Sequence, residues 1–279
     1  MQPEGESRSA HEDLNLFTSF DALIVFVSTV SFTALGTLLA GAYSPVCALG
    51  GGTGCALLFI HRYRRSFDWR MSAATLTSVL LLLCLALAFR LPAYRYEVGG
   101  QDQGTYWNMS RHFDRSGALP YIDKTREKIK NDPELLSIYD SNCHSSWHLA
   151  DKFYFHVPGL FIDRLEQSRY TFQFYHLHPL WMSISGWIFG TENRAGSSVF
   201  FSILAIACWV LCFLELGGLP SRAVLLGACL AVHPLLSFFA KLPVSESTAG
   251  AFFAAALYYL LRFRRQAQRG VVVQGYLWI

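Results

Sequence analysis

The sequence predicts an all-α, polytopic helical membrane protein whose large outer loop carries interfacial helices. Two observations support this class. Of the 279 residues, 52% are hydrophobic and only 15% are charged, whereas typical soluble domains carry about 25% charged residues. The charges also cluster between long apolar runs, and one polar segment from about 93 to 174 separates two apolar blocks. Because about 20 apolar residues cross a bilayer as a helix, this distribution indicates several spans.

Six apolar runs have the length and composition expected of spans. They cover residues 21–42, 45–61, 72–92, 197–216, 222–240 and 246–262. The second run is short and contains Gly50-Gly-Gly-Thr-Gly54. Small residues let helix backbones approach closely, so we expect this run to pack tightly against the first.

Basic residues predict the orientation of these spans. His61-Arg-Tyr-Arg-Arg65 follows the second run, and Arg262-Phe-Arg-Arg265 follows the sixth. Cytoplasmic loops are rich in Lys and Arg, so both clusters are expected inside. The N-terminus is then cytoplasmic, and the loop 93–196 is periplasmic or extracellular. A net charge of +3 is too small to suggest a nucleic-acid partner.

The segment from Pro179 to Gly190 is too short to span a membrane. Its 12 residues give about 18 Å of helix, against a hydrocarbon core of about 30 Å. Apolar residues recur in it at helical spacing. We therefore predict an interfacial helix with Trp181 and Trp187 at headgroup depth. The alternative is a span that begins near Tyr170.

These predictions divide the chain into four regions. They are a cytoplasmic tail (1–20), a two-span hairpin (21–71), a module of spans with its outer loop at 93–196 (72–265), and the start of a further, truncated segment (266–279).

Asp102 is the strongest candidate for chemistry. Gly99 and Gly100 permit a tight turn after the preceding span. The stretch Gln103–Ser116 predicts a helix, with Asp102 at its N-cap and Gly117 just past its end. Asp102 either caps this helix or acts chemically. As an anion favoured by the helix N-terminus, it could orient an acceptor hydroxyl, accept its proton, or bind a divalent cation such as Mg or Mn.

Other ionisable residues lie near the same predicted boundary. Glu246 begins a span, where it is either a first-turn acid or part of a cavity shared with Asp102. Glu97 either faces a cavity or pairs with Arg95. A phosphate group would need cations, and the candidates, each of which could instead anchor its helix, are Lys241, Arg194 and Arg111.

Histidines and charged residues in the outer loop have simpler interpretations. A zinc site needs three or four converging ligands, and the sequence contains no HExxH motif. The loop histidines therefore do not by themselves predict a metal; they are His144, His148, His156, His176 and His178. The stretch Asp123–Asp140 mixes charges of both signs and predicts a solvated, mobile segment.

Several short motifs resemble, in their order, the GT-C superfamily of membrane glycosyltransferases, over about residues 72–265. This superfamily includes protein O-mannosyltransferases, lipid A aminoarabinose transferases and oligosaccharyltransferases. The motifs are Arg90-Leu-Pro92, Gly99-Gly-Gln-Asp-Gln-Gly104, Phe174-Tyr-His-Leu-His-Pro-Leu180, Phe189-Gly190, Glu192-Asn-Arg194 and Lys241-Leu-Pro-Val-Ser-Glu246.

The resemblance implies transfer of a sugar from a polyprenyl-phosphate donor to a lipid, glycan or protein acceptor outside the membrane, with inversion. Asp102 would be catalytic and the donor's lipid tail would lie between helices. The donor or acceptor pocket would include Gln101, Gln103, Tyr106 and His178. The chain departs from the pattern because relatives often carry Asp-Glu where it has Asp102-Gln103. Two spans also precede the module, and the later spans and C-terminal domain of many relatives do not follow.

Two other functions compete with the enzyme. A transporter or lipid flippase would place ionisable residues within its spans and often shows internal repeats. Here Arg90, Glu215 and His233 lie near span ends or beside Pro234, and no repeat is evident. A non-catalytic scaffold with the same fold is the other alternative, because the Asp-Glu pair is missing.

Overall fold

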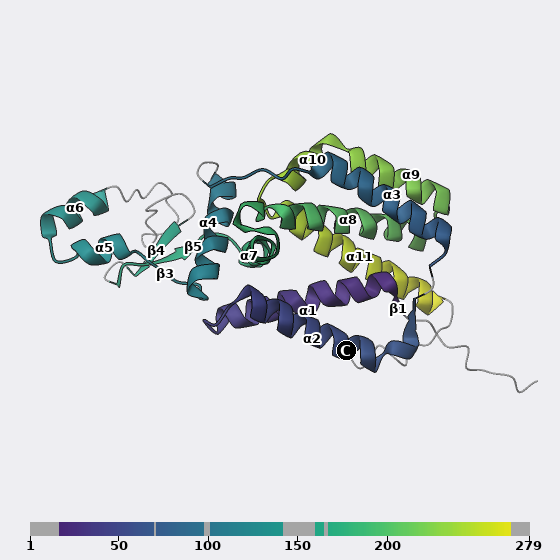
Figure 1. Ribbon diagram of the computed structural model, residues 1–279, viewed down its shortest axis with the longest axis horizontal. Helices are drawn as coiled ribbons and strands as arrows, with labels where there is room; N and C mark the ends of the chain where they lie inside the picture. Colours follow the sequence, from purple (N-terminus) through teal and green to yellow (C-terminus); the bar gives the residue numbers. More distant parts are fainter. Residues whose placement is uncertain (1–16, 70, 98–100, 142–159, 165–166, 269–279) are drawn as a thin grey trace, which may run out of the picture.

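The computed structural model describes residues 17–69, 71–97, 101–141, 160–164 and 167–268. This part of the chain is largely helical, with eleven α-helices and five short strands. Most of the helices lie lengthwise beside one another, and α4 crosses one end of them (Figure 1). A smaller group made of α5, α6 and three strands lies beyond α4 (Figure 1).

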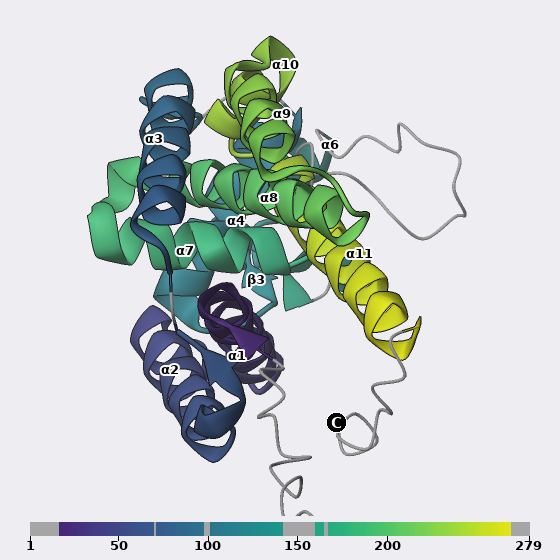
Figure 2. The same cartoon turned by 90° about the vertical axis from the view of Figure 1, so that its right-hand side faces the viewer.

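The lengthwise helices occupy the predicted apolar runs. They are α1 (Ser19–Leu39), α2 (Pro45–Arg62), α3 (Ala73–Arg90), α8 (Gly196–Glu215), α9 (Pro220–Val232), α10 (Pro234–Lys241) and α11 (Glu246–Gln268). Viewed along the bundle, α1 and α2 lie on one side of α8, and α3 and α9 lie on the other (Figure 2).

The remaining elements are shorter. The helices are α4 (Gln101–Ser116), α5 (Lys124–Ile129), α6 (Pro133–Ser141) and α7 (Leu177–Phe189), and the strands are β1 (Phe17–Thr18), β2 (Phe67–Asp68), β3 (Tyr121–Ile122), β4 (Leu160–Arg164) and β5 (Arg169–Phe172). Single 3-10 turns cover Arg64–Ser66 and Thr191–Asn193.

Within the described residues, three or four of the six predicted spans have the length and apolar composition of membrane helices. They are α1, α3, α8 and, if the two are taken together, the bent pair α9 and α10. Both α2 and α11 form helices where predicted but fall below this apolar composition, so their crossing of a membrane stays a prediction. The physical reason is composition: α2 is rich in glycine and ends in His61-Arg62, and α11 ends in an arginine-rich turn.

The run 222–240 is not one straight helix. It breaks between α9 and α10 with a bend of 55°. Pro234 follows the break, and His233 before it is extended, with φ −60° and ψ 120°. Proline lacks an N–H and disfavours the helical conformation of the residue before it, which explains the break. Nδ1 of His233 then accepts a hydrogen bond from the backbone N–H of Leu236 (3.4 Å).

The two ends of the bundle differ in character. One end gathers the turn between α1 and α2, the end of α3, the start of α8 and the segment between α10 and α11 (Figure 1). The opposite end holds His61, Arg62, Arg262 and Arg265. This is the alternation that the basic clusters predict. The assignment of the first end to the outside of a membrane stays a prediction.

Helix α7 lies in the core. Residues His178 to Gly186 are all buried, and Nε1 of Trp181 donates a hydrogen bond to Oγ of Ser31 on α1 (3.0 Å). Trp187, in contrast, is exposed. Trp181 is therefore covered by protein, because α1, α2, α4 and α8 all pack around this short helix, and the placement of both tryptophans at headgroup depth stays a prediction. The alternative of a span from Tyr170 is wrong, since Tyr170 lies in strand β5.

The all-α prediction needs a small correction. Strands β3, β5 and β4 form an antiparallel sheet in that order, with Tyr121 opposite Tyr170. At the other end of the molecule β1 pairs in parallel with β2. These strands are two to five residues long, too short to produce a clear alternating pattern in the sequence.

The segment Asp123–Asp140, predicted to be solvated, is ordered into α5 and α6. Asp123 caps α5, because its Oδ1 accepts hydrogen bonds from the backbone N–H groups of Thr125 and Arg126. Arg126 is buried and holds Asp140 through two hydrogen bonds of 3.0 and 2.8 Å. One pair of these charges, Arg126 and Asp140, therefore joins the two helices, while most residues of the segment are exposed, as the solvated interpretation predicts.

The glycines of α2 allow the close packing that the sequence predicts. A Cβ atom added at Gly52 would lie 2.4 Å from Cα of Val30 on α1. A Cβ atom at Gly51 would lie 3.0 Å from Cγ2 of Thr33. At Gly50, nothing lies within 4 Å of such an atom. The predicted tight contact between α1 and α2 is thus confirmed.

We expect Gly52→Ala to destabilise the protein by about 1–3 kcal/mol, because the new methyl group must push the α1 backbone away. Gly50→Ala is the matched control. It should stabilise α2 by roughly 0.5–1 kcal/mol, since alanine favours helix and the site is open. The measurement is the free energy of unfolding in mixed micelles. Equal effects of the two substitutions would contradict the close approach at Gly52.

Candidate functional site

The first part of the candidate site is the start of α4. The helix begins at Gln101, two residues earlier than predicted, so Asp102 lies in its first turn and not at its N-cap. Its end is as predicted, because Gly117 follows with φ +65°, a left-handed conformation that glycine adopts easily. Asp102 is exposed in the first turn of α4, the helix that crosses one end of the bundle (Figure 1).

Tyr106 connects α4 to the start of α11. It lies one turn after Asp102, on the same side of the helix, and its ring is buried. Its hydroxyl donates a hydrogen bond to Oγ of Ser245 (3.0 Å). Burial raises the pKa of Tyr106, the Ser245 hydrogen bond lowers it, and the negative charges of Glu246 and Asp102 raise it further. The hydroxyl is therefore neutral, and its hydrogen bond joins the first turn of α4 to the segment before α11.

Glu246 reaches this position as the first residue of α11. The sequence predicts it as a first-turn acid, and the structure confirms that placement. Its side chain is exposed, as is that of Asp102. Each acid lies at a helix N-terminus, where backbone N–H groups favour an anion. The Tyr106–Ser245 hydrogen bond thus brings together two helix starts, far apart in the sequence, that each carry an exposed carboxylate.

His178 lies behind Tyr106. The edge of one ring meets the face of the other, with centroids 5.1 Å apart. Nδ1 of His178 and Oγ1 of Thr248 on α11 are hydrogen-bonded (2.8 Å), and Nε2 is buried without a partner in the described part of the chain. Burial lowers the pKa of His178 to about 3. The imidazole is therefore neutral at physiological pH and supports the site by packing and hydrogen bonding.

This buried histidine predicts a loss of stability in mild acid. The unfolded chain takes up a proton near pH 6.5, whereas folded His178 does so only near pH 3. The free energy of unfolding should therefore fall as pH drops below 6.5, by about 2 kcal/mol at pH 5. Burial also lowers the pKa of His112 and His176, which act in the same direction.

The measurement is the free energy of unfolding between pH 7.5 and pH 5. His178→Gln should flatten this pH dependence, while His61→Gln, which alters an exposed residue of α2, should leave it unchanged. A slope that is the same in both variants and in the wild type would contradict the assignment to His178.

Lys241 lies four residues before Ser245, the hydrogen-bond partner of Tyr106. It is half-buried at the end of α10, and its carbonyl accepts a hydrogen bond from the backbone N–H of Tyr94 (2.7 Å). Its ammonium group lies 5.7 Å from the centre of the Tyr94 ring. Lys241 is thus held on the short segment that leads to Ser245 and Glu246.

The structure places the other predicted residues differently. Glu97 pairs with Arg95, the simpler of its two interpretations, with Nε to Oε1 at 2.6 Å. Arg111 lies 3.9 Å from Glu97, and the nine residues from Asp102 to Arg111 correspond to about 13 Å along α4. Gln103 is half-buried on α4. The side chain of Gln101 lies outside the described residues.

Arg194 belongs to a buried network on the side of α7. It pairs with Asp114 of α4, and its Nη1 donates to Oγ of Ser110 (3.2 Å). Oγ of Ser183 on α7 donates to Asp114 and lies 2.7 Å from the hydroxyl of Tyr43. This network fixes α4 against α7 and the turn after α1, so Arg194 is placed to orient α4 and is separate from the Asp102 group.

Sequence reasoning missed three members of this arrangement. Asp114, Ser183 and Thr248 each occupy unremarkable positions within helices. Asp114 and Ser183, which hydrogen-bond to one another, are 69 positions apart, and Thr248 is 70 positions from its partner His178. No local pattern marks such contacts, because they depend on how α4, α7 and α11 pack together.

The described part of the chain contains no cluster of three or more His, Cys, Asp or Glu side chains placed to hold a metal ion. The predicted loop residues His144, His148 and His156 lie outside the described residues.

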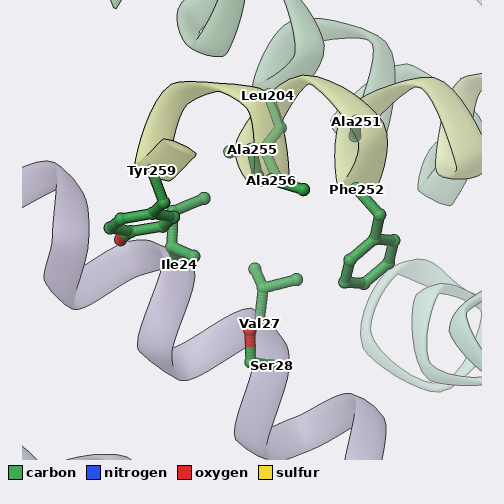
Figure 3. Close-up of a pocket in the computed structure, with 9 residues that line it drawn as sticks. All are labelled: Ile24, Val27, Ser28, Leu204, Ala251, Phe252, Ala255, Ala256 and Tyr259. Carbon is green, nitrogen blue, oxygen red and sulfur yellow. The ribbon is translucent and has the colours of Figure 1, made fainter. Parts of the chain in front are cut away.

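A cavity of about 220 Å³ lies between α1, α8 and α11 (Figure 3). It is lined mainly by apolar side chains, among them Ile24 and Val27 of α1, Leu204 of α8, and Phe252 of α11. Ala251, its first lining residue on α11, comes five residues after Glu246, or about 7.5 Å along the helix. An apolar space thus begins within the bundle a short distance from the acidic group.

Comparison with known proteins yields no relative. No family model, curated protein or solved structure matches the chain.

Proposed function

We propose that this protein is a membrane glycosyltransferase that moves a sugar from a polyprenyl-phosphate donor to an acceptor outside the membrane. One observation carries the proposal: the hydrogen bond from Tyr106 to Ser245 joins the first turn of α4, which carries Asp102, to the start of α11, which carries Glu246, at one end of an apolar bundle. Lys241 lies on the segment that leads to the same group. The order of motifs that resembles GT-C enzymes gives these residues their proposed roles.

The proposed chemistry is a single displacement with inversion. An acceptor hydroxyl attacks the anomeric carbon of the sugar, and the bond from that carbon to the phosphate oxygen breaks. Asp102 accepts the hydroxyl proton as the new bond forms. The polyprenyl phosphate leaves with the electron pair, and Lys241 stabilises its negative charge. Glu246, at the start of α11, orients the acceptor or the sugar.

The surroundings of the group suit a lipid-linked donor. Three or four helices are apolar and long enough to cross a membrane, and the apolar cavity beside α11 suits a hydrocarbon chain. A donor with a polyprenyl tail would place its tail among the helices and its phosphate at the bundle end. A nucleotide sugar has no hydrocarbon chain that could occupy the apolar cavity.

The test is transfer of labelled sugar in proteoliposomes that contain the purified full chain. A panel of polyprenyl-phosphate sugars is compared with the corresponding nucleotide sugars, with membrane lipid extract as a source of acceptors. We expect turnover with at least one polyprenyl-phosphate donor and none with the nucleotide sugars. Turnover with a nucleotide sugar alone would contradict the donor class. Absence of all turnover in folded protein would favour the scaffold or the transporter.

A further inference from the structure

Arg90 is a fully buried cation bound to neutral oxygen atoms. It ends α3 and has no exposed surface. Its Nε donates to Oγ of Ser202 on α8 (2.8 Å), and its Nη1 donates to the carbonyl of Ala231 (2.6 Å). Nη2 donates to the carbonyl of Leu230 (3.2 Å). Two of these acceptors lie in the last turn of α9, immediately before the break.

The break explains why these carbonyls need a donor. In a continuous helix the carbonyl of Leu230 would accept from the backbone N–H of residue 234. Residue 234 is proline and has no N–H. The carbonyl of Ala231 also lies beside the break, where it accepts a second hydrogen bond from the hydroxyl of Ser237 (3.3 Å). A guanidinium group satisfies both carbonyls and complements the negative end of the α9 dipole.

The same segment of chain also holds the other end of α10. Four residues after Arg90, the backbone N–H of Tyr94 donates to the carbonyl of Lys241 (2.7 Å). The Tyr94 ring lies under the Lys241 ammonium group. Residues 90–94 therefore contact the broken span just before α10 and again at its last residue, which fixes α10 at both ends.

We propose that Arg90 is a positioning residue that keeps the α9–α10 span bent and thereby places Lys241 beside the Asp102–Glu246 group. Pro234 breaks the helix, and the contacts of Arg90 hold the bend without reference to any reaction. Its consequence for sugar transfer rests on the proposed function. In this arrangement Arg90 replaces the hydrogen bond that Pro234 cannot make, and Pro234 in turn gives Arg90 its carbonyl partners.

The test uses two variants of the full chain in lipid bilayers, Arg90→Met and Arg90→Met/Pro234→Ala. Methionine keeps apolar contact but donates no hydrogen bond. The measured quantity is the rate of acylation of Lys241 by an amine-reactive reagent, followed by mass spectrometry, with Lys124 as the internal reference. Loss of charge-assisted hydrogen bonds to two carbonyls should raise the Lys241 rate by about tenfold in Arg90→Met.

The double variant separates positioning from simple packing. Alanine at 234 supplies the missing N–H to Leu230, so thermal stability should return toward the wild-type value while the Lys241 rate stays high. A wild-type Lys241 rate in folded Arg90→Met would overturn the proposal. Failure of Pro234→Ala to restore stability would also overturn it. Because acylation needs no donor sugar, both outcomes can be measured even if the protein does not transfer sugar.

Discussion

Replacing Asp102 with asparagine is expected to lower the rate of sugar transfer by about 100-fold or more. The amide keeps the size of the side chain and can still hydrogen-bond, but it cannot take the proton of an acceptor hydroxyl. Losses of 10²–10⁴ are typical when a general base is removed. The measurement is transfer of labelled sugar in proteoliposomes at saturating donor, with the amount of folded protein determined in the same sample.

Glu97→Gln is the matched control for this substitution. Glu97 is a carboxylate on the same stretch of chain, but it pairs with Arg95 and lies outside the Tyr106 group. Its removal should change the transfer rate by no more than about twofold, as expected for an exposed ion pair. An Asp102→Asn variant as active as Glu97→Gln would leave Asp102 only the role of a first-turn acid that stabilises α4.

Arg194→Met is expected to cause the largest loss of stability, about 3–5 kcal/mol. Arg194 has only 4% of its side chain exposed and pairs with Asp114, whose side chain is 24% exposed. Removing one member of a buried pair leaves the other charge without compensation, which costs more than the pair itself contributes. The measurement is the free energy of unfolding in mixed micelles.

Two further variants test the cause of this loss. Arg95→Met removes an exposed arginine from its ion pairs with Glu97 and Glu192, and the free energy of unfolding should stay near the wild-type value. Arg194→Met/Asp114→Asn removes both buried charges and should recover part of the lost stability. If Arg194→Met were no less stable than Arg95→Met, the Asp114 network would not be what holds α4 in place.

The helix ends were predictable because their signals are local. Asp102, Lys241 and Glu246 each lie where an apolar run meets a polar segment, and Gly117 marks the end of α4. These signals located the helices to within a few residues, including the two-residue error at the start of α4. The break at Pro234 had a local signal too. The apolar composition of 222–240, taken without Pro234, indicates one continuous span.

The buried polar contacts could not be predicted in the same way. Asp114 finds Ser183 and Arg194 only after α4 folds across the end of the bundle. Within the exposed stretch 123–140, the contacts of Asp123, Arg126 and Asp140 have no local signal, because nothing in the sequence shows that α6 returns to α5. The burial of Trp181 likewise has no local signal, since a helix of this length has no sequence signal for being covered on all sides. Tertiary packing decided each of these cases.

The most direct test of the proposed site is a double-mutant cycle between Asp102→Asn and Glu246→Gln, measured as the rate of sugar transfer in proteoliposomes. If the two carboxylates act on one reacting group beside Tyr106, each single variant should be strongly impaired, and the double variant should be about as slow as the slower single one. If the double variant loses the full product of the two effects, or if Glu246→Gln transfers sugar at the wild-type rate, the two acids do not form one site.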